Sequence, residues 1–428
     1  MINVALLGCG TVGSGVVKLL TANGEAIARK TGAEIRIAKV LEKEPEKCFA
    51  LGLQAEQITS DFADILNDES ITIVVELIGG MEPAFSFITA AMKKGKHIVS
   101  ANKDLIAEKG KELFAIAEEN QVDFYFEASV AGGIPIVYPL KQSLAGNRIL
   151  EVIGILNGTT NYILSKMSRE SCDYRQALQE AQQLGYAEAD PSADVEGMDA
   201  ARKIAILSSI AFNSRVTLRD VYVEGITAIT LRDIQYAREL GFAVKLLAIA
   251  KEVEGNVQIR VHPAFVPFNH PLAFVNDVYN AVFVKGDAVG EIMHYGRGAG
   301  SLPTASAVTG DIIEIGRSLL HHSNARIGCT CFEEKRILPI SELNAEYYIR
   351  MTVADRPGVL AGIAGVFGDH HVSIAQVLQK TSQHDRAELI MITHLVREKD
   401  MQDALTVLRS MNIIEEINNV VRLEGNHI

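Results

Sequence analysis

The chain has 428 residues, of which 48% are hydrophobic and 22% charged, and its formal net charge is −12. This length exceeds one compact core and fits two or three domains. The acidic balance argues against a nucleic-acid partner, which needs a basic surface. No apolar run reaches the length of a membrane span, and the start, MINVALLGCG, lacks the features of a signal peptide. We therefore expect a cytoplasmic protein without a membrane or nucleic-acid partner.

The five cysteines are expected to be reduced thiols, because their number is odd and the chain shows no secretion signal. Cys329 and Cys331 are separated by one residue, but no second Cys/His pair lies near them in the sequence. A structural zinc site is therefore the less favoured interpretation of this pair.

Predicted strands and helices alternate over the first 130 residues, a pattern typical of a parallel α/β sheet. The predicted strands are Ile2–Leu7, Glu34–Leu41, Ile71–Ile78, His97–Ser100 and Val122–Glu127. The predicted helices are Val12–Arg29, Pro83–Lys94 and Asp104–Glu119.

The pattern changes at about Gly132. The next predicted elements are the strands Ile149–Leu156, Asn256–His262 and Ala281–Gly286 and the helices Tyr174–Leu184 and Asp199–Phe212. They indicate an α+β substrate and dimerisation domain over residues 131–340, with an open mixed or antiparallel sheet.

A third unit over residues 345–428 has the predicted order βαββαβ, the ferredoxin-like motif. Its elements are Tyr347–Ala354, Val359–His370, Val372–Gln379, Ala387–His394, Glu398–Ser410 and Ile413–Leu423.

A glycine-rich loop joins the first predicted strand to the first helix. It comprises Gly8, Cys9, Gly10, Thr11, Val12 and Gly13 and matches G-x-G-x-x-G. Glycines permit a tight turn and close approach to a pyrophosphate, and the helix N-terminus supplies unpaired N–H groups. Residues 1–130 are therefore predicted to form a Rossmann-type NAD(P)-binding domain.

The second strand is followed by Glu42 and Lys43. A carboxylate there suits the ribose hydroxyls of NAD, whereas a cation suits the 2′-phosphate of NADP. Both residues could equally be solvated surface charges. The sequence leaves the choice open between NADP and NAD, with a slight preference for NADP tolerance through Lys43.

Several segments in matching order over residues 1–330 resemble homoserine dehydrogenase. They are VELIGG (75–80), SANK (100–103), FEASVAGGIP (126–135), NGTTN (157–161), GYAEADP (185–191), DAARK (199–203) and GAGSLPTA (298–305). The resemblance implies interconversion of L-homoserine and L-aspartate 4-semialdehyde with a nicotinamide cofactor. It also implies cofactor contacts at Gly79, Ser100, Lys103 and Gly300. Because nothing precedes the strand at Ile2, we expect no fused aspartate kinase.

Asp199 and Lys203 are four residues apart on a predicted helix and therefore share one face. An ordinary surface salt bridge would explain such a pair, but the apolar residues that follow indicate a largely buried helix, where ionisable groups are costly unless they line a cleft. A lysine near the reacting oxygen can accept and return the hydroxyl proton. The resemblance gives that role to Lys203 and an orienting role to Asp199.

The resemblance also implies a substrate pocket and a second active-site lysine. Glu188 would hold the substrate ammonium, and Tyr186, Asp194, Gly158 and Thr159 would line the same pocket, although the last two could belong to a simple helix N-cap. Lys103 follows a predicted strand, where α/β folds bind ligands, but it could also be an unremarkable lysine at a helix start.

The segment with Glu127, Val130, Gly132 and Ile134 resembles the family's monovalent-cation loop, in which a carboxylate and backbone carbonyls would bind Na⁺ or K⁺. Oxygen ligands suit a hard cation, and glycines allow carbonyls to turn inward. A hinge between domains is the alternative interpretation.

The segment Val353–Leu360, with Pro357 and Gly358, resembles the strand–loop–helix signature of ACT domains. The resemblance implies L-threonine as effector and assembly into homodimers or homotetramers. A dimerisation module without an effector is the alternative.

Two rival functions stay open. Another amino-acid oxidoreductase of the same plan, such as an aspartate dehydrogenase, would not be expected to carry Glu188, Asp199 and Lys203 together. A catalytically silent sensor would not need Lys103 and Lys203.

Overall fold

The computed structural model describes residues 1–323, 328–381 and 385–425. The chain forms two compact units from non-consecutive segments. The first unit comprises residues 1–156, 202–220 and 280–335, and the second comprises 157–201, 221–279 and 336–428. Helix α9 (Met198–Ala211) begins in the second unit and ends in the first. Among the described residues, no helix has the length and apolar character needed to span a membrane.

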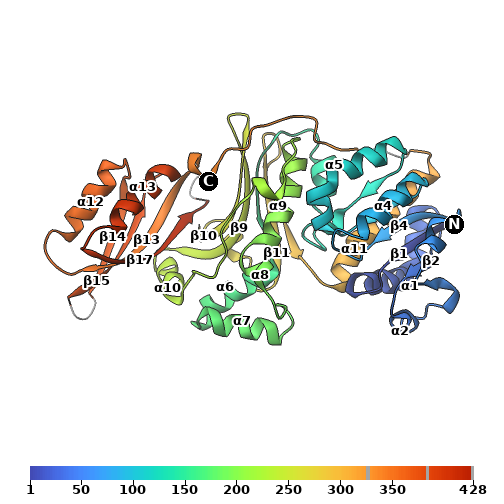
Figure 1. Ribbon diagram of the computed structural model, residues 1–428, viewed down its shortest axis with the longest axis horizontal. Coiled ribbons are helices and arrows are strands. Elements are labelled where there is room, and N and C mark those ends of the chain that lie inside the picture. The colour runs from blue at the N-terminus through green and yellow to red at the C-terminus, as the bar shows by residue number, and fades with distance from the viewer. Residues whose placement is uncertain (324–327, 382–384, 426–428) are drawn as a thin grey trace. The chain divides into compact units, whose positions relative to one another are not determined.

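The first unit contains a six-stranded sheet in the order β3-β2-β1-β4-β5-β6, and every neighbouring pair is parallel (Figure 1). The strands are β1 (Ile2–Leu7), β2 (Ile35–Leu41), β3 (Ile58–Thr59), β4 (Ile71–Glu76), β5 (His97–Ser100) and β6 (Phe124–Tyr125). The order reverses between β1 and β4. Open parallel sheets bind ligands at the carboxyl edge beside such a reversal.

Amphipathic helices bury the apolar residues of this sheet. They are α1 (Thr11–Thr31), α2 (Pro45–Phe49), α3 (Ala63–Leu66), α4 (Ala84–Lys93), α5 (Lys103–Glu119) and α11 (Ser301–Leu320). One core joins β1, β2 and β4 to the apolar faces of α1 and α11. These two helices approach so closely that a Cβ on Gly15 would lie 2.5 Å from the backbone oxygen of Ser301. A segment that is distant in the sequence therefore completes the packing around the first strands.

The rest of the first unit follows β6. A 3₁₀ turn (Glu127–Ser129) and a short π-helix (Pro139–Ser143) lead to β7 (Ile149–Ile155), which pairs antiparallel with β11 (Tyr279–Gly286). On its other side, β11 pairs with β12 (Gly290–Arg297).

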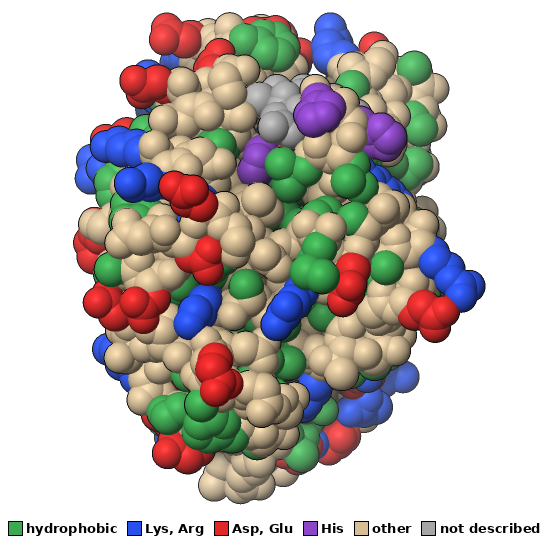
Figure 2. All heavy atoms as spheres, turned by 90° about the vertical axis from the view of Figure 1, so that its right-hand side faces the viewer, with side chains coloured by type: hydrophobic (Ala, Val, Ile, Leu, Met, Phe, Trp, Pro, Cys, Tyr) green, Lys and Arg blue, Asp and Glu red, His purple; other side chains and the backbone are tan. Residues whose placement is uncertain are grey.

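Figure 2 shows basic and acidic side chains interspersed on the face that it displays.

Two twelve-residue strands, β9 (Phe242–Val253) and β10 (Asn256–Pro267), form an antiparallel hairpin in the second unit. Glu254 and Gly255 connect them and both have positive φ, as the twist of a two-residue hairpin requires. Helices α6 (Gly158–Glu170), α7 (Tyr174–Gln183), α8 (Ser192–Val195) and α10 (Leu231–Glu239) complete this part, with the short strand β8 (Tyr222–Val223) parallel to β10.

The C-terminal part of the second unit has the predicted βαββαβ order: β13 (Asn344–Ala354), α12 (Val359–Asp369), β14 (Ile374–Thr381), β15 (Arg386–Thr393), α13 (Glu398–Arg409) and β17 (Ile414–Leu423), with β16 (Val396–Arg397) beside β13. Its four long strands form antiparallel neighbours in the order β17-β13-β15-β14. The carboxyl end of β17 also pairs in parallel with β10, at Ala264↔Arg422 and Phe265↔Leu423.

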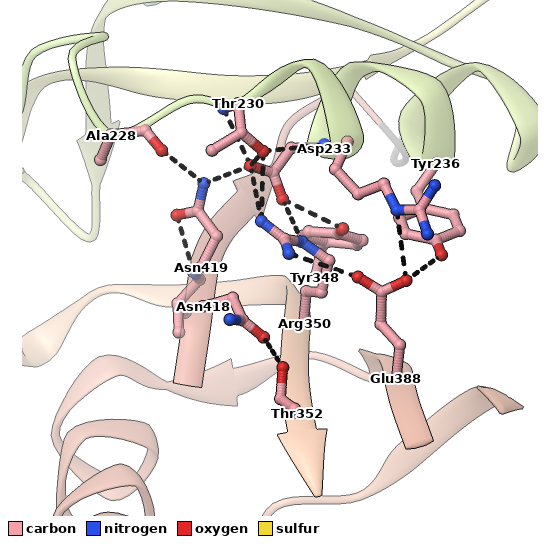
Figure 3. Close-up of polar contacts among 12 residues, drawn as sticks. Ala228, Thr230, Asp233, Tyr236, Tyr348, Arg350, Thr352, Glu388, Asn418 and Asn419 are labelled. Atoms are coloured by element: carbon pink, nitrogen blue, oxygen red, sulfur yellow. Dashed lines mark hydrogen bonds and ion pairs between the residues drawn. The ribbon is translucent and has the colours of Figure 1, made fainter. Parts of the chain in front are cut away.

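A buried polar network connects α10 to the C-terminal sheet (Figure 3). Asp233 on α10 is completely buried and accepts hydrogen bonds from Arg350 Nε at 2.8 Å and Asn419 Nδ2 at 2.9 Å. Arg350 also contacts Glu388 at 3.3 Å, and Tyr236 donates to Glu388. Although burial alone would raise the pKa of Asp233, hydrogen bonds from Arg350, Thr230 and Asn419 hold it below its ordinary value.

The structure confirms the predicted N-terminal parallel sheet and C-terminal βαββαβ order. Most element ends lie within three residues of the prediction, as in α1, which runs from Thr11 to Thr31 rather than from Val12 to Arg29. The largest difference is in β10, which continues to Pro267 instead of ending at His262. Among the longer elements, β9, β12, α10 and α11 were not predicted, and only the N-cap of α6 was recognised from the sequence. The apolar run of β9 fits a buried strand or a buried helix equally well, because periodicity cannot distinguish them.

We expect Asp233→Asn to lower the free energy of unfolding by about 3 kcal/mol, because it leaves the buried Arg350 guanidinium without its counter-charge. The loss should appear in urea unfolding followed by circular dichroism. Since the pKa of Asp233 is lowered in the folded chain, its contribution should be present at neutral pH and disappear as the pH falls below about 4, the value for an unfolded aspartate.

The matched control is Glu415→Gln, which breaks the exposed Arg386–Glu415 pair at 2.8 Å. Exposed pairs contribute about 0–1 kcal/mol. Equal losses in the two variants would contradict a stabilising role for the buried pair.

Candidate active site

The glycine loop after β1 has the shape of a pyrophosphate cradle. Gly8 has φ +101°, and a Cβ on Gly13 would lie 2.2 Å from the Gly8 carbonyl oxygen, so both positions require glycine. A Cβ on Gly10, in contrast, would meet no atom within 4 Å. Gly10 caps α1 without a side-chain hydrogen bond, and the first turn of α1 holds no acidic residue. The open space in front of a helix N-terminus therefore fits a dinucleotide phosphate.

Glu42 lies at the end of β2, where the sequence predicts a ribose contact. Its carboxylate accepts hydrogen bonds from the backbone amides of Cys9 at 2.8 Å, Lys43 at 2.9 Å and Glu44 at 3.1 Å. Burial alone would raise the pKa of Glu42, but these amides hold it below its ordinary value. Its negative charge is thus fixed beside the glycine loop, whereas Lys43 is exposed.

A second carboxylate, Glu76, organises the loops after β4 and β5. It is completely buried and accepts from the backbone amides of Ile78 and Gly79, each at 2.9 Å, and from Ser100 Oγ at 2.7 Å. The sequence analysis assigned no role to Glu76, because its partner Ser100 is 24 residues away. The predicted cofactor residues Gly79 and Ser100 are therefore joined through one side chain.

Lys103 and Lys203 lie on helices that an ion pair connects. Lys103 begins α5, and its neighbour Asp104 contacts Arg202 on α9 at 2.6 Å. Lys203, next to Arg202, is half-buried and donates from Nζ to the carbonyl oxygen of Leu156 at 2.7 Å. The helix positions that carry both predicted lysines are thus held within the first unit.

In the second unit, Asn157 brings the predicted substrate-pocket residues together. Its Nδ2 donates to Asp194 at 2.6 Å and to Asp199 at 3.0 Å, while its Oδ1 accepts from the amide of Thr160 and so caps α6. Asp199 is buried. The sequence analysis recognised the cap but not these two carboxylate contacts.

The other predicted pocket residues lie around the start of α6 and the loop after α7. Gly158 is the first residue of α6, and Thr159 Oγ1 donates to the carbonyl oxygen of Tyr186 at 2.7 Å. The Tyr186 ring is 43% exposed. Glu188 is exposed. Its backbone oxygen accepts a hydrogen bond from Gln182 Nε2.

The carboxylate of Glu127 accepts hydrogen bonds from three backbone amides. It accepts hydrogen bonds from the amides of Ile136 at 2.6 Å, Val137 at 2.8 Å and Tyr138 at 2.6 Å. Despite these bonds, burial raises the pKa of Glu127 above its ordinary value. A cation in this loop would therefore be held by carbonyl oxygens rather than by the Glu127 carboxylate.

The predicted cation loop lies against residues 298–300, which contain the predicted cofactor contact Gly300. Gly132 has φ +53°, and a Cβ there would lie 2.3 Å from the carbonyl oxygen of Gly298. Gly300, with φ +121°, then caps α11. Val130 and Ile134 are buried. Within residues 1–323, 328–381 and 385–425, no three His, Cys, Asp or Glu side chains gather in a way that could hold a metal ion.

The C-terminal domain has its own cavity of about 410 Å³. It is lined by the predicted loop, Val353 to Leu360, together with Gln379 and Leu389. Gly358, with φ +92°, caps α12 without a side-chain hydrogen bond, so amides at the start of α12 are available to an anionic group.

The parallel sheet in the order 3-2-1-4-5-6 and its open glycine loop define a dinucleotide-binding domain of the kind found in NAD(P)-dependent oxidoreductases. Models of the families "Homoserine dehydrogenase, NAD binding domain", "Homoserine dehydrogenase" and "ACT domain" match residues 8–127, 135–313 and 347–412, respectively. The homoserine dehydrogenase of Synechocystis sp. is 46% identical over 99% of both chains. This chain belongs to the homoserine dehydrogenase family.

Solved structures agree with this assignment. The crystal structure of a homoserine dehydrogenase from Thiobacillus denitrificans matches with a TM-score of 0.94 and 42% identity, covering 99% of this chain and 98% of the other. A hyperthermophilic archaeal homoserine dehydrogenase, solved in complex with NADPH, matches with a TM-score of 0.65 and 27% identity over 76% of this chain and 99% of its own. The predicted family, activity and ACT domain are confirmed.

We expect Gly10→Ala to weaken dinucleotide binding while leaving the unfolding midpoint unchanged. The added methyl group meets no protein atom but occupies the space in front of α1. A titration that follows the fluorescence of the reduced cofactor measures the affinity, and thermal unfolding measures stability. Gly24→Ala, in open space on the same helix, is the control: it should leave cofactor affinity unchanged, although alanine inside a helix raises stability by about 1 kcal/mol. Unaltered cofactor affinity in Gly10→Ala would contradict the predicted cradle.

Proposed function

We propose that Lys203 exchanges the hydroxyl proton during the interconversion of L-homoserine and L-aspartate 4-semialdehyde. The observation that carries this proposal is the hydrogen bond from Lys203 Nζ to the Leu156 carbonyl oxygen at 2.7 Å, which fixes an ammonium group on a largely buried helix. In the reducing direction, Lys203 donates a proton to the aldehyde oxygen, and in the oxidising direction it removes the proton from the hydroxyl group.

Lys103, the second lysine, stabilises negative charge on the same substrate oxygen. The Asp104–Arg202 ion pair supports this role, because it holds the start of α5 to α9. The bound nicotinamide would supply the hydride chemistry. Gly8, Gly10, Thr11, Val12 and Gly13 would hold its phosphates, and Gly79, Ser100 and Gly300 would contact the rest of the dinucleotide.

The predicted pocket residues hold the substrate in this proposal. Glu188 is exposed, and its carboxylate is suited to binding the substrate ammonium group. Asp199 acts as a positioning residue: it is one helical turn from Lys203 on α9 and accepts from Asn157. Asp194 shares that amide, and Tyr186, Gly158 and Thr159 form the wall beside it.

Glu42 decides the preference between the two cofactors in this proposal. Its fixed negative charge beside the glycine loop favours the ribose hydroxyls of NAD and repels the 2′-phosphate of NADP. Lys43, which is exposed and adjacent, allows NADP to bind as well. We expect both cofactors to be used, with the higher kcat/KM for NADH.

A monovalent cation, Na⁺ or K⁺, is proposed to bind the backbone oxygens of Glu127, Val130, Gly132 and Ile134. The positive φ of Gly132, and of Ala131 before it, supports a loop whose carbonyl groups turn inward. Turnover should then depend on Na⁺ or K⁺ in the buffer.

L-Threonine is the proposed effector, bound in the cavity of the ACT domain. Asp355 offers a carboxylate to its ammonium group, the amides at the start of α12 face its carboxylate, and Gln379 faces its hydroxyl group. Residues 131–340 are also proposed to pair between chains and give homodimers, and pairing of the ACT domains would extend these to homotetramers, in the cytoplasm.

The proposed domains are residues 1–130 for the dinucleotide, 131–340 for the substrate and dimerisation, and 345–428 for the effector. Each family match falls within one of these ranges.

Lys203→Ala should lower kcat by about 10²–10⁴-fold, the range for loss of a general acid–base group, and leave cofactor binding intact. The assay follows the absorbance of NADH and of NADPH with L-aspartate 4-semialdehyde, and cofactor fluorescence reports binding. Lys109→Ala, which removes an exposed lysine paired with Glu112 on α5, is the control. Near-normal turnover by Lys203→Ala would exclude the proposed role, and absence of turnover by the unaltered chain would favour the silent sensor.

Gln379→Leu should raise the threonine concentration needed for half-maximal inhibition by about 2- to 10-fold, the effect of losing one hydrogen bond of about 0.5–1.5 kcal/mol. Gln376→Leu is the control, because Gln376 is exposed on the same strand and does not line the cavity. Point variants are preferable to truncation, since removal of β17 would also unpair β10. Equal threonine sensitivity in both variants would place the effector elsewhere.

A further inference from the structure

Two thiols lie together on the surface of the first unit, outside the proposed active site. Cys329 is exposed and Cys331 half-buried. The backbone amide of Cys331 points to Cys329 Sγ at 3.5 Å, and Cys331 Sγ donates to the carbonyl oxygen of Ser209 on α9 at 3.6 Å. Just after Cys331, the backbone is held by a hydrogen bond from Glu333 N to the Asn213 carbonyl oxygen at 2.8 Å.

Two cations face this pair from other elements. Lys141, on the π-helix, donates from Nζ to the carbonyl oxygen of Gly328 at 3.1 Å and lies over the rings of Phe114 and Phe126. Arg215 lines the same small cavity as Lys141, Cys329 and Cys331. The acidic groups nearest to Lys141 are Glu127 and Asp311, and burial lowers the pKa of Lys141 to about 8, so it is still mostly charged at neutral pH.

The surroundings shift the pKa values of the two thiols in opposite directions. The thiol and amide of Cys331, with Lys141 and Arg215, hold the pKa of Cys329 below its ordinary value. The hydrogen bond to Cys329 and burial raise the pKa of Cys331. An exposed thiolate is therefore next to a protonated, half-buried thiol, the arrangement of an attacking and a resolving cysteine.

The other three cysteines provide an internal comparison. Cys9, Cys48 and Cys172 are buried, and burial raises the pKa of each above its ordinary value. Buried thiols of this kind are unreactive.

We propose that Cys329 and Cys331 form a redox-active dithiol, which low-molecular-weight disulfides oxidise to a Cys329–Cys331 disulfide. The Cys329 thiolate attacks one sulfur of the disulfide RSSR, the S–S bond breaks, and RS⁻ leaves with a proton from solvent. Cys331 then attacks Cys329 Sγ in the mixed disulfide, passing its proton to the second RS⁻ as that group leaves. The protein loses two electrons, and RSSR is reduced to two RSH.

The experiment exposes the full-length chain to oxidised glutathione, quenches with acid, alkylates the remaining thiols and identifies tryptic peptides by mass spectrometry. Residues 327–335 form one tryptic peptide that holds both cysteines. We expect this peptide to become unalkylated and lighter by two hydrogen atoms, at a rate at least about tenfold above modification of Cys172. Cys331→Ser should stop at the glutathione adduct on Cys329, and Cys329→Ser should leave Cys331 alkylatable.

Lys141→Met tests the cause of the reactivity, because it removes the facing charge but keeps an apolar side chain between the two aromatic rings. The pH at which adduct formation on Cys329 is half-maximal should rise in this variant, while Lys109→Met should leave that pH unchanged. Oxidation of the wild-type pair no faster than that of Cys172 would overturn the proposal, as would equal rates of adduct formation in Cys329→Ser and the wild type.

Discussion

Buried carboxylates need backbone amides as hydrogen-bond donors, and this requirement determines the path of the chain directly after β6 in the first unit. The Glu127 side chain collects three amides from residues 136–138, and its own amide donates to Asp311 on α11 at 2.9 Å. A carboxylate deprived of water needs such donors, so the chain must turn back on itself directly after the nucleotide-binding sheet. That turn places Gly132 against Gly298 and brings α11 back onto α1. Glu42 and Glu76 apply the same constraint to the loops after β2 and β4.

The sequence predicted those parts of the structure whose signal is local. The glycine loop, the strands β1 and β4 and the βαββαβ order follow from short patterns of apolar residues and glycines. Helix α11 was not predicted. It packs on α1, which is almost 300 residues away in the sequence, and no local pattern near Ser301 indicates that contact. In the site, the spacing of Asp199 and Lys203 indicated a shared helix face. The carboxylate contacts of Asn157 could not be predicted, because Asp194 and Asp199 are 37 and 42 residues distant.

The ACT domain is built into the second unit through polar as well as backbone contacts. Arg350 and Asn419 of its sheet contact Asp233 of α10 (Figure 3). In addition, β17 pairs in parallel with β10. The network is buried and largely hydrogen-bonded, so small displacements of its members are costly. An effector that shifts β13 or β15 would therefore act on α10 directly, and α10 leads into the long strand β9. The second unit thus contains a continuous series of contacts from the ACT sheet to α10 and β10.

The pairing of β10 with β17 also has a consequence for biosynthesis. Arg422 follows its partner Ala264 by roughly 150 residues, an interval on the order of 10–30 s at a synthesis rate of about 5–20 residues per second. During that time the carboxyl half of β10 has an unpaired backbone edge of apolar residues, which is the kind of surface that joins other chains. The nascent chain must keep this edge shielded until its last strand leaves the ribosome, so cells that make the protein at high rates should depend on chaperones that hold exposed strands.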